Sequence, residues 1–125
     1  MKRLRLLAVL LALSLMVGEA WRSWGAGRPA YAWLDDQIMG AMLLAGAWAM
    51  ARDTLARRAF FAAGWGVNAG MLYGSFFGKL FEPARTNAGN FDLVLLTWLV
   101  GLAFAVSIAG MILTITLPQQ REGLR

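Results

Sequence analysis

Four long apolar runs without a charged side chain constrain the fold of this 125-residue chain more than any other feature. The runs cover residues 6–18, 37–51, 59–78 and 93–120, and they contain 13, 15, 20 and 28 residues. A helix that crosses a lipid bilayer needs roughly 20 mainly apolar residues. The last two runs are long enough alone, and the first two are long enough once charged residues at their ends are included. The pattern predicts transmembrane helices over about residues 4–24, 33–51, 55–78 and 91–117.

The composition supports lipid as the solvent for these runs. Hydrophobic residues make up 59% of the chain and charged residues 15%, against about 45–50% and about 25% in an average soluble domain. The chain has no cysteine and no histidine, which excludes thiolate nucleophiles and most transition-metal sites. It also shows no phosphate-binding glycine loop, no catalytic triad and no carboxylate cluster at metal-binding spacing. We therefore expect a membrane protein that has no enzymatic activity, no metal and no cofactor.

The links between the runs are short and contain Gly, Pro and Asn, which is typical of turns and loops. Short links make consecutive helices antiparallel neighbours. In the link before the third run, Asp53 or Thr54 is expected to be the N-cap of the next helix. The expected fold is an all-α, antiparallel (up-down) four-transmembrane-helix bundle that forms one domain over residues 1–125.

The basic residues predict the orientation of this bundle, because short cytoplasmic loops collect Lys and Arg. With the N-terminus inside, eight basic residues are cytoplasmic: Lys2, Arg3, Arg5, Arg52, Arg57, Arg58, Arg121 and Arg125. Four are on the opposite side: Arg22, Arg28, Lys79 and Arg85. Both termini are therefore expected to be cytoplasmic. Arg outnumbers Lys ten to two, which favours a GC-rich bacterium, and hence the bacterial inner membrane.

The first run has two interpretations that the sequence leaves open. Its basic start, its apolar centre and the stretch Gly18-Glu19-Ala20 fit a cleaved signal peptide. However, Trp21 and Trp24 follow directly, as interfacial aromatic residues would at the outer end of a retained helix. We favour the retained helix.

Small residues recur at every fourth position of the third run. Positions four apart lie on one face of a helix, and small residues allow membrane helices to approach closely. We expect this groove to pack against a helix of the same bundle or against a second chain. The groove is formed by Gly66, Gly70, Gly74 and Gly78. The matching small faces on the second and fourth helices include Ala41, Ala45, Gly101 and Ala105.

Polar residues in the third run face away from this groove. Asn68 is near the middle of the run, and Lys79 follows at its outer end on the same face as Asn68. Polar side chains at such depth face protein or a cavity, so Asn68 either forms an interhelical hydrogen bond or contacts a ligand. Trp65 and Trp98 are also deep and are expected to pack inside the bundle.

Two adjacent acids, Asp35 and Asp36, come at the expected start of the second helix. Acids at a helix start cap free N–H groups and interact favourably with the helix dipole. Alternatively, Asp36 lines an outward-facing vestibule with Glu19, in a pair with Lys79 or Arg22. In that case Gly40, Leu43 and Ala47 continue the same inward face of the helix.

These features are compatible with two classes of function. The first is an accessory or assembly subunit of the inner membrane, which acts by helix packing. The second is a minimal oligomeric transporter or channel with a polar path near Asp36, Asn68 and Lys79. The expected partners are the bilayer and a second copy or another membrane protein. Nucleic acid is not expected, because the basic residues lie at the ends of apolar runs.

Overall fold

A computed structural model describes residues 1–118 of the chain, apart from the side chain of Ala32. Over this range the protein is all-helical, and it contains no strand. The helices are α1 (Lys2–Ser23), α2 (Ala30–Ala49), α3 (Leu55–Phe81), the short 3₁₀ helix η1 (Pro83–Arg85) and α4 (Leu93–Thr116). The prediction of a chain with four long helices is thus confirmed. Arg121 and Arg125, two of the expected cytoplasmic residues, lie outside the described residues.

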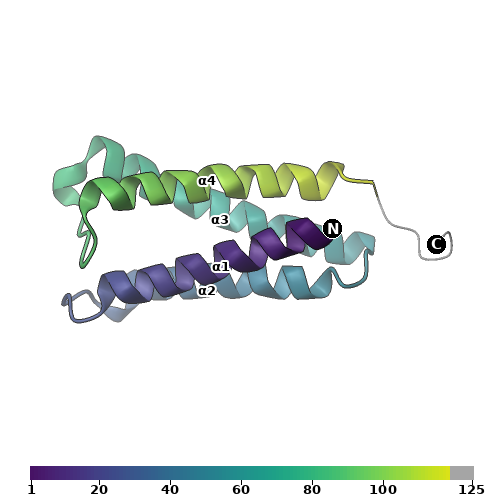
Figure 1. The fold of residues 1–125 in the computed structure, drawn as a ribbon, viewed down its shortest axis with the longest axis horizontal. Helices are drawn as coiled ribbons and strands as arrows, with labels where there is room; N and C mark the ends of the chain where they lie inside the picture. The colour runs from purple at the N-terminus through teal and green to yellow at the C-terminus, as the bar shows by residue number, and fades with distance from the viewer. Residues whose placement is uncertain (119–125) are drawn as a thin grey trace.

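The four helices lie side by side and alternate in direction (Figure 1). α3 packs most extensively on α4, α1 packs on α2, and α2 packs on α3, whereas α1 and α4 contact each other much less. The ring of helices therefore has one loose seam, between its first and last members. We call the end with the α2–α3 turn (residues 50–54) the turn end. The opposite end, with the connections 24–29 and 82–92, is the loop end.

Two of the helices, α1 and α4, are long and apolar enough to cross a membrane. Of the helices described, α2 and α3 do not meet the same criterion of length and composition. Glycine, alanine and polar residues occupy many of their positions in place of long aliphatic side chains. These properties of α1 and α4 are consistent with membrane association.

The half of the bundle nearer the turn end is closely packed around two aromatic rings of α3. Phe61 and Trp65 are fully buried, and their ring centroids are 5.6 Å apart. Gly46 of α2 and Gly110 of α4 face these rings. A Cβ atom built on Gly46 would lie 3.0 Å from Cδ1 of Phe61, and one built on Gly110 would lie 2.5 Å from Cδ2 of Trp65. The absence of side chains at these glycines lets α2 and α4 approach α3 closely.

The expected glycine groove of α3 lies mostly on the outside of the bundle. A Cβ atom built on Gly70, Gly74 or Gly78 would meet no atom of a neighbouring helix within 4 Å. Gly66, near the sulfur of Met111, and Gly101, against the ring of Phe76, do face a neighbouring helix. These three glycines therefore do not pack within the described part of the chain, and contact with a second chain stays a prediction there. The expected small faces at Ala41, Ala45 and Ala105 are also exposed.

Arginines at the turn end bind the backbone at the C-terminal ends of helices. Arg5 donates from Nε to the carbonyl oxygen of Ala47 at 2.7 Å, and Arg58 donates from Nη1 to that of Thr114 at 3.1 Å. These helix-terminal carbonyls can use such donors, because the last four of a helix lack partners within it. Of the two expected N-caps of α3, Thr54 is the one observed: its hydroxyl accepts a hydrogen bond from the backbone N–H of Arg57.

Candidate functional site: a cavity at the α1–α4 seam

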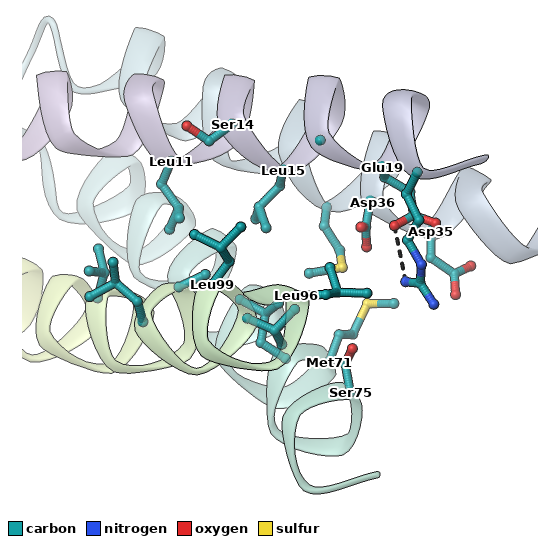
Figure 2. A pocket seen from close by; sticks show the side chains of 18 of the residues that line it. Leu11, Ser14, Leu15, Glu19, Asp35, Asp36, Met71, Ser75, Leu96 and Leu99 are labelled. Carbon is teal, nitrogen blue, oxygen red and sulfur yellow. Dashed lines mark hydrogen bonds and ion pairs between the residues drawn. The ribbon is translucent and has the colours of Figure 1, made fainter. Parts of the chain in front are cut away.

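A cavity of about 500 Å³ opens along the seam between α1 and α4. Figure 2 shows Leu11 and Leu15 of α1 opposite Leu96 and Leu99 of α4, with carboxylates farther toward the loop end. The space exists because α1 and α4 make few contacts. Ligand pockets in proteins usually enclose about 300–1,000 Å³. The cavity is therefore large enough to bind a ligand, and it has an apolar part and a charged end.

Glu19 is at the centre of the charged end and is only 6% exposed. Its Oε2 accepts a hydrogen bond from Nη1 of Arg22 at 3.2 Å, and its Oε1 forms an ion pair with Arg28. A dashed line in Figure 2 marks an ion pair of Glu19. Arg22 also donates from Nε to the backbone oxygen of Asn87 at 3.0 Å. The two arginines thus neutralise a buried carboxylate, which would be costly to bury alone, and connect α1 to both loops.

The loops reach this position because of three glycines in the left-handed region. Gly25 and Gly27 have φ values of +68° and +73°, a conformation that glycine adopts without steric cost. They reverse the chain after α1, so that Arg28 returns to Glu19. In the other loop, Gly89 has a φ of +59° and lies directly against the carbonyl oxygen of Arg22.

Asp36 belongs to this charged end and does not cap its helix. α2 begins at Ala30, with Pro29 as its N-cap, so Asp36 is in the second turn, beyond the free N–H groups of the first. The capping interpretation is therefore wrong. The carboxyl group of Asp36 lines the cavity together with Glu19.

Lys79 of α3 lines the same cavity and directly follows the third uncharged run. It is only 7% exposed, and its Nζ donates to Oγ of Ser75 at 2.7 Å. Among the described residues, Lys79 has no ion pair, and the expected pairs of Asp36 with Lys79 or Arg22 are not formed. Burial, reinforced by the charge of Arg22, lowers the pKa of Lys79 to about 8.

Asn68 does not reach the cavity. Its side chain is fully buried, and Nδ2 donates to the backbone oxygens of Met39 at 3.1 Å and Gly64 at 2.8 Å. The first of these bonds joins α3 to α2, which is the interhelical hydrogen bond considered from the sequence. Glu19, Asp36 and Lys79 thus come together, while Asn68 lies in the core. Gly40, Leu43 and Ala47 are buried, as expected for the inward face of α2.

A second hollow of about 410 Å³ lies next to Lys79 and Ser75 at the loop end. Its wall contains no carboxylate among the described residues, and part of it is formed by the bare backbone at Gly74 and Gly78. The orientation predicted from the sequence places the four basic residues of this wall on one side of the membrane, but it does not predict that they lie next to one another. The only local pattern that points to this site is the i, i+3 spacing of Glu19 and Arg22. The four basic residues of the wall are Arg22, Arg28, Lys79 and Arg85.

Comparison of the chain with protein-family models, curated proteins and solved structures finds no match. The cavity, its charged end and the basic hollow are therefore the features on which a function can be argued.

Proposed function

We propose that the protein is a small multi-pass inner-membrane protein with a non-enzymatic accessory role, and that the α1–α4 cavity is its functional surface. All four uncharged runs then cross the bilayer. This arrangement is supported by the position of the charges that line the cavity, because Glu19 directly follows the first run, Asp36 directly precedes the second and Lys79 directly follows the third. These three charges lie together at the loop end. The boundary between membrane and water can therefore pass between them and the uncharged runs of all three helices.

The excess of basic residues at the turn end favours a cytoplasmic location for that end. Arg5, Arg52, Arg57 and Arg58 are all there or next to it, and three of them donate to helix-terminal carbonyls. The loop end, with the cavity's charged residues, then faces the periplasm.

One observation favours binding over conduction: the charged residues of the cavity all lie at its loop end, and toward the turn end its lining, as far as Leu7 and Val106, is uncharged. In that direction Phe61, Trp65 and Asn68 of α3 are fully buried. A single chain in this conformation therefore offers a site for a ligand or partner, without a polar route through the described part of the bundle. The transporter alternative keeps one supporting observation, which is that Glu19, Asp36 and Lys79 line a cavity.

Cysteine accessibility separates these two functions, because the chain has no cysteine of its own. Single cysteines replace Ser75 at the cavity and two buried residues nearer the turn end: Ser107, which is fully buried, and Ala47, which is 2% exposed. In membranes, a water-soluble thiol reagent should modify Ser75→Cys. It should leave Ser107→Cys and Ala47→Cys unmodified from either side, while the highly exposed Trp24→Cys serves as the positive control. Modification of both buried positions would show a route through the bundle and favour a transporter.

A further inference from the structure

We propose that the α1–α4 cavity binds one phospholipid-like amphiphile, with an acyl chain between the two helices and an anionic phosphate head group in the basic hollow beside Lys79. The inference rests on the proposed membrane location and names the ligand class of the same site. It follows from the shape of the cavity, from its opening toward the membrane and from the arrangement of the charges around Lys79.

The apolar part of the cavity has the length of a lipid tail. On α1 its uncharged lining extends from Leu7 to Gly18, and eleven residues at 1.5 Å each span about 16 Å. One leaflet contributes about 15 Å of hydrocarbon to the bilayer. Three leucines of the lining are strongly exposed on the outside of the bundle, at 55% for Leu10, 45% for Leu99 and 64% for Leu102. The cavity is therefore open sideways, and a chain can enter it from the surrounding lipid.

The charges place an anionic head group at the loop end. Lys79 is buried and is bound only by Ser75 among the described residues, so its ammonium group lacks a counter-ion. Toward the hollow, the wall contains four cations and, in the described part, no carboxylate; two of them, Arg22 and Arg28, also pair with Glu19 on the cavity side. These four cations are all the basic residues that the orientation places outside the cytoplasm. A phosphate accepts charge-assisted hydrogen bonds from Lys and Arg, which makes it the complement of this wall.

The opposite side of Lys79 explains why the head group belongs in the hollow and not deeper in the cavity. Glu19 and Asp36 line the cavity there and would repel an anion. Exposed Arg85, whose nearest acid is Glu82 at 3.3 Å on the surface, adds a cation at the outer rim. Gly74 and Gly78 leave the inner wall of the hollow free of side chains.

The test measures lipid binding to the detergent-purified protein by native mass spectrometry. Phosphatidylglycerol and phosphatidylcholine with identical acyl chains are titrated separately, and sn-glycerol 3-phosphate is the head group without a tail. We expect phosphatidylglycerol to bind about tenfold more tightly than phosphatidylcholine, as for one charge-assisted contact. sn-Glycerol 3-phosphate should not compete at the same concentrations. Equal binding of the two lipids, or full competition by sn-glycerol 3-phosphate, would overturn the proposal.

Two pairs of matched variants locate the lipid. Lys79→Gln should weaken phosphatidylglycerol binding about tenfold. Lys2→Gln, which removes the same charge at the turn end of the bundle, should not. Leu99→Trp fills the cavity and should weaken binding of both lipids, whereas Leu95→Trp, on the same helix and outside the lining, should not. If Lys79→Gln does not fold, exposed Arg85→Gln is compared with exposed Arg52→Gln, with a smaller loss expected for Arg85→Gln alone.

Equal effects within either pair would contradict the assigned site. These results are separable from the proposed function, because the cysteine experiment measures insertion and accessibility without any added lipid. Loss of lipid selectivity with an unchanged cysteine pattern removes only the ligand assignment.

Discussion

At the scale of single residues, Glu19 and Asp36 are an unequal pair of carboxyl groups. Glu19 forms ion pairs with Arg22 and Arg28, which compensate its charge in a buried position. Asp36 lines the same cavity, and among the described residues it forms no ion pair. The arginines of α1 and of the following loop therefore compensate only one of the two carboxyl groups.

Gly89 holds the α3–α4 loop against α1 and should tolerate no side chain. Both Gly89 and Gly25 have positive φ, so alanine costs about 1–2 kcal/mol of backbone strain at either position. At Gly89 the new Cβ would also overlap the carbonyl oxygen of Arg22, while at Gly25 it meets nothing within 4 Å. Chemical denaturation should therefore show a larger loss for Gly89→Ala than for Gly25→Ala. Equal losses would mean that the loop moves aside freely.

At the scale of elements, the glycines of α3 and α4 have different roles although they look alike in the sequence. Gly110 faces the ring of Trp65 at the α3–α4 contact, whereas Gly70 is on the open surface of α3. Regular spacing identified the surface glycines. The isolated Gly110, which carries the closer contact, has no comparable pattern, because its importance depends on which ring the neighbouring helix presents.

This difference predicts opposite effects for the same substitution. Gly110→Ala should destabilise the bundle by about 1–3 kcal/mol, because its Cβ would lie 2.5 Å from Trp65. Gly70→Ala should be neutral or stabilising by up to about 1 kcal/mol, since alanine favours a helix over glycine. Thermal unfolding of the purified variants measures both changes. A large loss for Gly70→Ala, accompanied by dissociation of an oligomer, would instead place a second chain on the surface groove.

The sequence predicted the helices well and their inward faces only in part. Uncharged length and short links were sufficient to predict four helices, and the N-cap at Thr54 followed from local chemistry. The start of α2 was placed three residues too late, at 33 instead of Ala30, and this error produced the capping interpretation of Asp36. Trp65 is fully buried as expected, but Trp98 is 71% exposed, because depth along a helix does not determine which face turns inward.

The sequence identified residues of the candidate site, but it did not predict how they are arranged. Glu19, Asp36 and Lys79 were recognisable as charges at the ends of apolar runs. The contact of Arg28 with Glu19 depends on two left-handed glycines in a loop, and the cavity depends on the loose α1–α4 seam. Neither property is local in the sequence, so both required the structure.

At the scale of the whole molecule, the bundle is closely packed around the aromatic rings of α3 and open along the α1–α4 seam. Glycines of α2 and α4 allow the close packing, while the loose seam leaves a cavity whose charged residues lie at the loop end. The proposed function requires that all four helices cross the membrane, with the loop end outside.

Labelling of single cysteines in intact cells with a membrane-impermeant thiol reagent tests this dependence most directly. Trp24→Cys and Ala84→Cys are exposed positions at the loop end, and Ala51→Cys is an exposed position at the turn end. We expect the first two to react in intact cells and Ala51→Cys to react only after permeabilisation. Reaction of all three from outside would show that only α1 and α4 cross the membrane, and would contradict the four-helix membrane bundle.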